Sequence, residues 1–376
     1  MGKSDRVVVL GGGIIGLAAA RALALDGHKV SVIDPDDLGV HASARAAGIL
    51  VRRGVMRSEE RGRMFYTRSI DLWPRWIGDV QAESGCEVPL WEGGDLCLFS
   101  HAGRAVRFAE MLSRESDPGD WQELAGVPAE MRTVLADRPW RIFHFPREMC
   151  LDPHCALDAL VKSCARLGVE LCHRSAVREV VRDGAGWKLL AGARPVTADV
   201  LLVSAGPWSE GILRTLGWQA RTVPVRGQIA LVPALYPGLS MLHLEDRFYA
   251  VPRSGQTLIG ATSEVGQWQE TTTSSGLADL QAMMGNLLPG LDLAGATRSW
   301  AGIRPRTLDR APHLGWLEEG RLLVASGHYR SGISMAPLTG QVVADLVSGR
   351  AAHPLARDLD PLRERSGYRP FASGAC

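Results

Sequence analysis

The stretch between residues 7 and 34 constrains the fold more than any other part of the chain. It begins with the apolar run Val7-Val8-Val9-Leu10, passes through Gly11-Gly12-Gly13-Ile14-Ile15-Gly16 into an Ala/Leu-rich segment, and ends with Val30-Ser31-Val32-Ile33-Asp34. A strand, a glycine-rich turn, a helix and a second strand in this order predict a dinucleotide-binding βαβ unit. An ordinary tight strand-to-helix turn is the alternative, but it gives no reason for an acid about 20 residues further on.

The size and charge of the residues in this stretch explain what each would do. Gly11 permits the tight turn out of the strand, Gly13 lets the backbone approach a pyrophosphate, and Gly16 lets the helix lie against the strand. The N–H groups at the start of the helix would face the phosphates. Asp34 stands at the end of the second strand, where a ribose hydroxyl needs an acceptor.

Length and charge exclude several classes of protein. A chain of 376 residues exceeds what one hydrophobic core usually serves, so we expect two lobes. The formal net charge is +1 and like charges form no run, which argues against a nucleic acid or an anionic membrane as partner. No apolar run approaches the roughly 20 residues of a membrane span, and the βαβ unit leaves no room for a signal peptide after Met1. We therefore expect a cytoplasmic protein.

Metal and hydrolase chemistry find little support. The seven cysteines are odd in number and form no C-x-x-C pair, as is typical of reduced thiols. Cys150, His154 and Cys155 are close in sequence and suggest zinc, but a second ligand pair is missing, so we interpret them as half-buried helix residues. We expect no metal site. G-x-S-x-G, H-E-x-x-H and P-loop motifs are absent from the sequence, which gives no support to acyl transfer, zinc hydrolysis or ATP hydrolysis.

A loop of small residues follows the second strand. It reads Leu38-Gly39-Val40-His41-Ala42-Ser43-Ala44-Arg45-Ala46-Ala47-Gly48-Ile49-Leu50. Small side chains allow close backbone approach, which next to a nucleotide site suits a pyrophosphate and the edge of a flat ring system. A flexible linker is the alternative, although the stretch lacks proline and closes on an apolar anchor.

The remaining pattern predicts an α/β fold with two domains. We expect helices at 59–83, 103–115, 152–167, 275–288 and 331–348, strands at 95–99, 169–172, 198–206 and 321–326, and a hairpin at 177–190. Closely spaced strands at 224–232, 248–252, 257–262 and 297–304 predict an antiparallel sheet. The expected division is a Rossmann-like dinucleotide-binding domain of residues 1–85, 147–222 and 301–376, and an inserted substrate-binding domain of residues 86–146 and 223–300 on the antiparallel sheet.

Two side chains in the second half of the chain are candidates for contact with a substrate. Arg304 precedes Pro305, which restricts Arg304 to an extended conformation and fixes the direction of its guanidinium. A planar fork of this kind suits a carboxylate, although a surface salt bridge is the alternative. Tyr249 lies on a predicted strand and could donate a hydrogen bond to a substrate or simply pack.

The segment from Gly327 to Ile333 follows a buried strand and opens a helix. This geometry aims backbone N–H groups and the positive end of a helix dipole at an anion, such as a reduced flavin. Ordinary helix capping by Ser331 explains the same residues.

Taken together, seven segments resemble the D-amino-acid-oxidase-like, FAD-dependent amine oxidases. These are residues 9–16, 43–49, 203–209, 224–228, 249–253, 302–305 and 327–333, and the resemblance covers nearly the whole chain. The last three are most similar to the glycine oxidases of thiamine biosynthesis. The resemblance implies a fold of the D-amino-acid-oxidase and glutathione-reductase-2 type with FAD as cofactor.

The resemblance also implies a set of site residues. Arg304 would clamp the substrate carboxylate, and Tyr249 and Arg330 would line the same catalytic site. The implied FAD-binding residues are Gly11, Gly13, Ile14, Ile15, Gly16, Asp34, Pro35, Ala42, Ser43, Arg45, Ala46, Ala47, Gly48, Ile49, Val177, Ala205, Gly206, Trp208, Gly302, Arg304, Gly327, His328, Tyr329, Arg330, Ser331, Gly332, Ile333 and Ser334.

Three residues depart from the family pattern. Arg45 stands where small residues are usual, and Arg52 and Arg53 add charge just beyond the flavin loop. The arginine pair raises the hypothesis that one of the two guanidinium groups selects a substrate with a second acidic group. Relatives attach flavin covalently at a cysteine or at a histidine. In this chain the first position has no cysteine and the second is occupied by Arg45, so we expect noncovalent FAD.

The implied activity is oxidative deamination of glycine or a small amino acid, such as sarcosine or a D-amino acid. Hydride passes from Cα to the flavin, and the products are an imine or 2-oxo acid, ammonia and hydrogen peroxide, with O2 as acceptor. Arg304 and Tyr249 would position the substrate, and no strong acid or base is required of the protein. The alternatives are a dehydrogenase that passes electrons to a quinone or partner protein, and the FAD-binding subunit of a hetero-oligomer. The sequence does not decide whether the protein forms a homo-oligomer.

Overall fold

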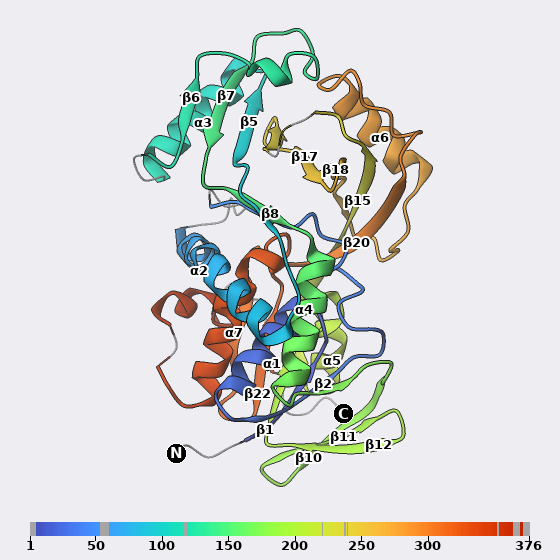
Figure 1. The fold of residues 1–376 in the computed structure, drawn as a ribbon. Helices are drawn as coiled ribbons and strands as arrows, with labels where there is room; N and C mark the ends of the chain where they lie inside the picture. Colours follow the sequence, from blue (N-terminus) through green and yellow to red (C-terminus); the bar gives the residue numbers. More distant parts are fainter. Residues whose placement is uncertain are drawn as a thin grey trace.

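The computed structural model describes residues 5–52, 60–115, 119–219, 221–236, 238, 240–351, 353–363 and 369–370. A six-stranded sheet forms the centre of one half of the molecule (Figure 1). Its order is β21 (His313–Glu318), β22 (Leu322–Ser326), β13 (Val200–Val203), β1 (Arg6–Leu10), β2 (Lys29–Ile33), β9 (Glu170–Cys172). All neighbours are parallel except β21 at the edge. The βαβ prediction is confirmed, because α1 (Ile14–Leu25) connects β1 to its parallel neighbour β2.

Alternation along β1 explains why this sheet lies between two layers. Successive side chains of a strand point to opposite faces. Val7 and Val9 pack into one buried cluster with the helices α1, α2 (Glu60–Ser84), α4 (Pro153–Arg166) and α7 (Gly332–Val347). Val8 and Leu10 pack into another with a small sheet of β10 (Val177–Asp183), β11 (Gly186–Ala191) and β12 (Arg194–Ala198). The predicted hairpin is therefore part of a three-stranded sheet that covers the second face.

The helices follow their sequence signals closely. Asp152 caps α4, because its Oδ1 accepts a hydrogen bond of 2.9 Å from the His154 N–H, and Pro153 occupies the first turn. α2 runs through Pro74 without ending there. α1 and α7 cross closely because α7 has Gly340, where a Cβ would lie 2.6 Å from the Ala18 oxygen. None of the described helices is both long enough and apolar enough for a membrane span.

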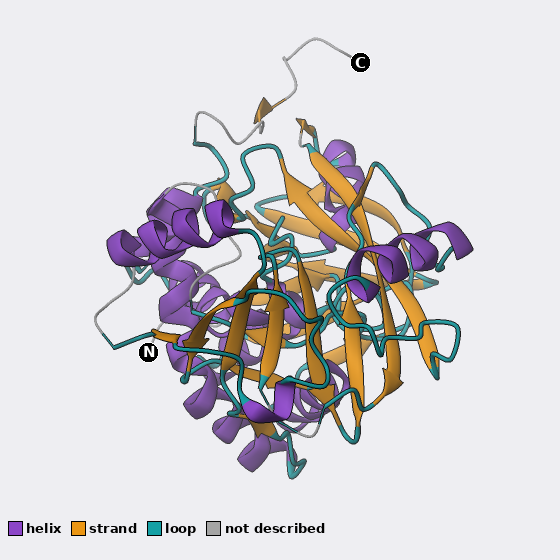
Figure 2. Ribbon diagram, turned by 90° about the horizontal axis from the view of Figure 1, so that it is seen from above, coloured by secondary structure: helices purple, strands orange, loops and turns teal. Residues whose placement is uncertain are grey.

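A nine-stranded sheet builds the other half of the molecule. Its order is β19 (Glu264–Val265), β15 (Thr222–Pro233), β18 (Gln256–Gly260), β17 (Phe248–Arg253), β16 (Met241–Leu244), β5 (Asp95–Phe99), β7 (Arg141–Phe145), β6 (Gln122–Leu124), with β20 (Arg298–Thr307) also paired to β15. The helices α3 (Ala102–Glu115) and α6 (Ser274–Gly285) lie beside its two ends in Figure 1, and Figure 2 shows helices flanking the strands from above. The two chain segments expected to share an antiparallel sheet do share one sheet, but they join through a parallel pair, β16 and β5.

Two of the differences from the sequence-based prediction concern the face of the large sheet that bears on the site. The strand predicted to end at residue 304 continues as β20 through Pro305, which lies opposite Pro224 of β15, so the expected boundary at residue 300 falls inside a strand. The strand β16 was not predicted. It pairs antiparallel with β17 and parallel with β5, so it joins the two segments of chain that form the sheet.

One face of the large sheet packs on α6, and the other carries a second apolar cluster that includes Ile229, together with several polar side chains. Ala230, Ile259, Ala250 and Leu242 lie side by side across four strands and pack into a cluster with α6. The residues directly before or after these four along their strands point to the opposite face. There the row reads Ile229, Gly260, Tyr249, His243 and Cys97. This row brings polar side chains to the face that meets the other half of the molecule.

The remaining described elements are short. Strands β3 (Ile49–Leu50), β8 (Met149–Leu151) and β4 (Leu90–Trp91) form a small sheet, and β8 lies where the chain passes between the two halves in Figure 1. Helix α5 (Ser209–Thr215), the pair β14 (Trp218–Gln219) and β23 (Arg369–Pro370), and the 3₁₀ turns η1 (Ala129–Met131), η2 (Gly206–Trp208) and η3 (Pro354–Leu359) complete the fold.

Candidate active site

A cavity of about 900 Å³ lies between the ends of the parallel strands and the polar face of the large sheet. Asp34 and Val177 line one end, and Tyr249 and Arg304 line the other. The cavity begins beside the carboxyl end of β1, where the chain continues to β2 on one side and later returns as β13 on the other. Ligands of open α/β sheets bind at such a switch point.

The glycine turn forms the wall beside β1. Gly11 has a φ of +111°, and a Cβ there would lie 2.7 Å from the backbone of Ser204 and Ala205. Gly13 caps α1, and the N–H of Ile14 donates to Ser43 Oγ at 3.0 Å. Gly16 lies outside the cavity and packs its Cα against the Gly11 carbonyl, which agrees with its predicted packing role. This cradle has room for a pyrophosphate only because the side chains are missing.

Asp34 is held in place by the turn that it faces. Its Oδ2 accepts a hydrogen bond of 2.7 Å from the Gly12 N–H, and its Oδ1 accepts one of 2.9 Å from the Asp36 N–H. The side chain is buried and lines the cavity. Because an ionised carboxylate has about four acceptor positions, two remain for a ribose diol.

Replacing Asp34 by alanine should weaken FAD binding. The loss of a charge-assisted hydrogen bond to ribose costs roughly 1.5 to 3 kcal/mol, which is about 10- to 150-fold in Kd. Titration of the apoprotein with FAD, followed by the flavin spectrum, measures this Kd. Asp37→Ala is the control, because the Asp37 carboxylate pairs with Arg174 outside the cavity. An unchanged Kd in Asp34→Ala would mean that the ribose lies elsewhere.

The loop of small residues is fastened to the large sheet by Arg45. Its guanidinium donates to the carbonyls of Val40 at 3.1 Å, Glu270 at 2.9 Å and Ala301 at 2.8 Å. A Cβ on Gly302 would lie 2.9 Å from the Arg45 Cβ, so Gly302 makes room for this side chain. The flexible-linker alternative therefore does not hold for this loop, and Arg45 has a structural reason to differ from a small residue.

His41 adds a second connection from the same loop. Its Nδ1 lies 2.9 Å from Glu270 and its Nε2 lies 3.0 Å from Asp36. The hydrogen bond with Glu270 raises the pKa of His41, with burial opposing the shift. The protonated form is thus favoured where the loop meets the large sheet.

The segment after β22 lines the middle of the cavity. Its N–H at Tyr329 donates to the Pro305 carbonyl at 2.9 Å, which couples this segment to β20. His328 is buried beside Thr339, with Nε2 and Oγ1 3.2 Å apart, and burial lowers the pKa of His328 to about 3. The imidazole is therefore neutral near pH 7.

Two serines of this segment lie outside the cavity lining. Ser331 occupies the N-cap position of α7 but its side chain makes no capping hydrogen bond, so the predicted capping alternative is not observed. Ser334 Oγ donates to the Ile49 carbonyl at 3.2 Å and accepts from Tyr66. It fastens α7 to the flavin loop and does not face the cavity.

Arg304 lies where two strands provide a recess. A Cβ on Gly227, across from Gly302 in the register of β15 and β20, would collide with all three terminal guanidinium atoms of Arg304. Arg304 Nη1 donates to the Thr262 carbonyl at 3.1 Å, which leaves other N–H groups for a ligand. Burial lowers the pKa of Arg304 from its ordinary value. The surface salt-bridge alternative is wrong, because the side chain lines the cavity.

Tyr249 is adjacent to Arg304 and is also placed by a glycine. A Cβ on Gly260, the cross-strand neighbour, would lie 2.5 Å from the tyrosine ring. Burial raises the pKa of Tyr249, and the charge of Arg304 is the largest of the effects that oppose the shift. Its hydroxyl stays protonated near pH 7 and can donate.

Arg330 lies at the rim of the cavity. Its side chain is exposed, and its guanidinium carbon is 5.3 Å from the centre of the Tyr329 ring. Burial alone would raise the pKa of Tyr329, yet the Arg330 charge and a hydrogen bond with Ser263 leave it lowered. Arg330 can attract an anion toward the cavity but is less restrained than Arg304.

The hypothesis of substrate selection by Arg52 or Arg53 is wrong for Arg52. Its guanidinium forms an ion pair with Asp71, and its N–H donates to Glu148 at 2.6 Å. The side chain does not line the cavity, because Asp71 of α2 draws it away. Arg53 lies outside the described residues.

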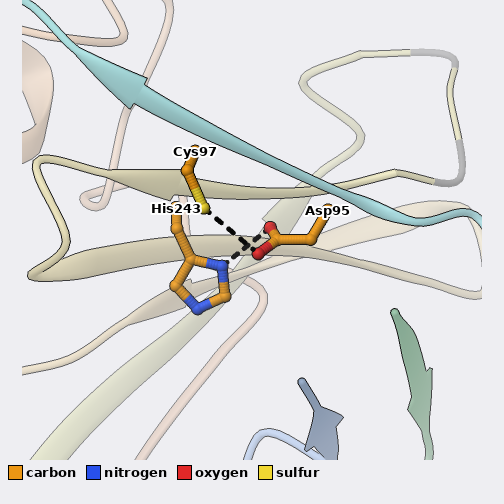
Figure 3. A group of neighbouring side chains, drawn as sticks. All are labelled: Asp95, Cys97 and His243. Carbon is orange, nitrogen blue, oxygen red and sulfur yellow. Dashed lines mark hydrogen bonds and ion pairs between the residues drawn. The ribbon is translucent and has the colours of Figure 1, made fainter. Parts of the chain in front are cut away.

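The cavity thus brings together nearly all the predicted site residues. Of the predicted set, only Gly16, Ser331 and Ser334 do not line it. Four residues that were not predicted also line the end with Tyr249 and Arg304, namely Gly227, His243, Asp246 and Arg247. His243 and Gly227 have no local signal, because only the register of their strands places them. The cluster Asp95, Cys97 and His243 was also missed (Figure 3).

Comparisons with known proteins agree with this geometry. The family model DAO, described as FAD dependent oxidoreductase, matches residues 6–346. Glycine oxidase of Pseudomonas aeruginosa is 31% identical over 98% of this chain and 99% of its own length. The crystal structure of glycine oxidase from Geobacillus kaustophilus has a TM-score of 0.87 and 29% identity over 96% of this chain and 100% of that one. Iminodiacetate oxidase from Chelativorans has a TM-score of 0.84 and 25% identity over 98% and 100%.

The family match spans most of the chain and includes the glycine turn, the small-residue loop and Arg304. The chain belongs to the DAO family of FAD-dependent oxidoreductases.

Proposed function

We propose that this protein catalyses the oxidative deamination of glycine or another small amino acid. The observation that carries the proposal is the Arg304 guanidinium, held in a recess over Gly227 at the end of a cavity that starts at a dinucleotide-binding turn. Such a fork recognises a carboxylate by two parallel hydrogen bonds. The similarity to glycine oxidases supports a small substrate.

FAD would lie along the cavity in this proposal. The glycine turn and Ser43 would hold its pyrophosphate, Asp34 its ribose, and the segments 45–49 and 327–333 its ring. When bound, FAD supplies a hydride acceptor and, with O2, a route to hydrogen peroxide. No cysteine is among the described residues that line the cavity, which supports noncovalent binding.

The protein's own residues position the substrate. Arg304 would hold the carboxylate, and the Tyr249 hydroxyl would donate a second hydrogen bond beside it. The guanidinium lacks an acidic partner among the described residues, so a substrate carboxylate would supply the missing anion. Two fixed anchors restrict the orientation of Cα, which is the main contribution required of the protein.

We also propose the domain division given by the two sheets. The parallel sheet and its helices would form the FAD-binding domain, and the nine-stranded sheet would form the substrate-binding domain. Because β20 belongs wholly to the large sheet, the boundary would lie after residue 307 instead of at 300.

A substrate panel tests the proposed function. Glycine, sarcosine, D-alanine and D-aspartate are mixed with the purified protein, and flavin reduction is followed without oxygen before peroxide is measured with oxygen. Flavin reduction together with peroxide supports an oxidase. Reduction without peroxide favours the dehydrogenase alternative, and no reduction by any of the four would contradict the proposal.

Noncovalent binding makes a separate prediction. Purified protein should be yellow, and acid precipitation should release the flavin into the supernatant, because no cysteine from the described chain reaches the cavity. The absorbance of the supernatant and of the washed pellet measures the partition. Flavin that stays with the pellet would indicate a covalent bond.

A further inference from the structure

A buried carboxylate and an imidazole form a dyad at the substrate end of the cavity. His243 Nδ1 lies 2.8 Å from Asp95 Oδ1, and the Cys97 thiol donates to Asp95 Oδ2 at 3.4 Å (Figure 3). Asp95 and Cys97 have no exposed surface, whereas His243 lines the cavity. Asp95 is therefore the member of the dyad that is buried in the sheet, and His243 is the member that faces the cavity.

The register of the strands explains why the imidazole faces the cavity. His243 of β16 lies opposite Tyr249 of β17 and beside Cys97 of β5, and residues opposite each other share one face of a sheet. The ring centres of His243 and Tyr249 are 6.2 Å apart. Figure 3 shows the second ring nitrogen, Nε2, pointing away from Asp95.

The carboxylate determines which nitrogen carries the hydrogen. An ionised carboxylate only accepts hydrogen bonds, so Nδ1 donates to Asp95 and the neutral ring keeps its lone pair at Nε2. The same contact stabilises the ring once it has gained a proton, because the imidazolium then lies against a buried negative charge. Such a ring is arranged to accept a proton from the cavity.

We propose that His243 is the acceptor for the ammonium proton of the substrate, with Asp95 as its positioning residue. The inference rests on the proposed function. A hydride leaves Cα only if the nitrogen lone pair is free, whereas amino acids are mostly ammonium ions near pH 7. One N–H bond of the ammonium breaks, its electron pair stays on the substrate nitrogen, and the proton forms a bond to His243 Nε2.

Among the described residues at this end of the cavity, His243 is the proton acceptor whose ring is held by a buried carboxylate. Burial raises the pKa of Tyr249, so its hydroxyl is not a base in this range. In the part of the chain that the structure describes, the charged side chains that line the same end are Asp246, Arg247, Arg304 and Arg330. Of these, only Asp246 is a carboxylate, and it lies in the turn after β16, three residues from His243. The arginines favour loss of a proton from a neighbouring ammonium through repulsion.

A metal ion is the other use of these three side chains, because their ligand atoms lie within 4.8 Å of one another. Zinc bonds to nitrogen and oxygen are about 2.0 to 2.2 Å, which separates two tetrahedral ligands by roughly 3.3 Å. The observed 2.8 Å between Nδ1 and Oδ1 is shorter than this separation and fits a hydrogen bond.

The test is the pH dependence of flavin reduction in the holoenzyme without oxygen. In the parent, the second-order rate constant for glycine should reach a plateau well below the pH at which glycine itself loses its proton in solution. In His243→Asn it should be roughly tenfold lower at pH 7 and keep rising until glycine itself loses its proton in solution. Asp95→Asn should move the profile in the same direction. Cys97→Ser, which keeps a donor for Asp95, should retain the parent profile.

Binding of acetate, followed by the flavin spectrum, should be equal in the parent and His243→Asn, because Arg304 is unchanged. If the second-order rate constant of His243→Asn is lower than that of the parent by the same factor at every pH, the dyad has only a structural role and the inference is overturned. Stoichiometric zinc that survives dialysis would overturn it as well. If no amino acid reduces even the parent flavin, the proposed function itself fails, which is a different result from a reducible parent with an unchanged His243→Asn profile.

Discussion

Replacing Arg304 by alanine should lower kcat/KM for the best substrate by about 30- to 1000-fold. A charge-assisted, bidentate contact in a desolvated recess is worth roughly 2 to 4 kcal/mol, and 1.4 kcal/mol corresponds to a factor of ten. Both binding and orientation depend on this fork, since Thr262 already occupies one of its N–H groups and fixes its direction. Anaerobic stopped-flow reduction measures the rate constant and the substrate Kd separately.

Two controls distinguish loss of substrate contact from loss of FAD. The flavin spectrum of Arg304→Ala should remain nearly that of the parent, because Asp34 and the glycine turn hold the nucleotide at the other end of the cavity. Arg304→Lys should recover little activity, since an ammonium group cannot reproduce a planar fork. A parent-like rate constant and Kd in Arg304→Ala would place the carboxylate elsewhere, and Arg330 would be tested next.

The parts of the fold that sequence predicts are those with local signals. The turn from β1 to α1 is specified by glycines at fixed offsets, and α4 by an Asp-Pro start. Arg304 was found for the same reason, because the proline beside it restricts its backbone. In each case the residues that determine the structure are neighbours in the chain.

The parts that sequence did not predict depend on distant pairing. Strand β16 has four residues, and besides its neighbour β17 it pairs with β5, from which it is separated by more than one hundred residues. The sequence therefore did not indicate that His243 faces a cavity or that Asp95 lies next to His243. Arg52 was misassigned for a similar reason, because its partner Asp71 lies on another element.

Two glycines of the large sheet show most clearly that a residue's role can depend on strand pairing that the sequence does not reveal. In sequence, Gly227 is one more small residue in a strand, whereas in space it is the floor under Arg304. Gly260 plays the equivalent part for Tyr249. Two side chains of the active site thus owe their positions to the missing Cβ atoms of neighbouring glycines.

Gly227→Ala should accordingly lower kcat/KM by about 100-fold while the protein still folds. The added Cβ would occupy the position of the Arg304 guanidinium, which is the end of a flexible side chain and can move away. A displacement of about 1 Å at a positioning group can cost 100-fold in rate. Gly16→Ala is different, because its Cβ would meet the backbone carbonyl of Gly11, which cannot move without disturbing the turn. Gly78→Ala, in an open position of α2, is the matched control and should retain parent activity.

The double variant Gly227→Ala/Arg304→Ala decides whether the glycine acts through the arginine. If Gly227 matters only because it makes room for the guanidinium, the added methyl group costs nothing once that guanidinium is gone. The double variant should then match Arg304→Ala in kcat/KM, and the coupling energy should equal the whole effect of Gly227→Ala, roughly 2.7 kcal/mol for 100-fold. Thermal unfolding of all three variants checks that each is folded. Additive losses would show that Gly227 supports the site by a route independent of Arg304.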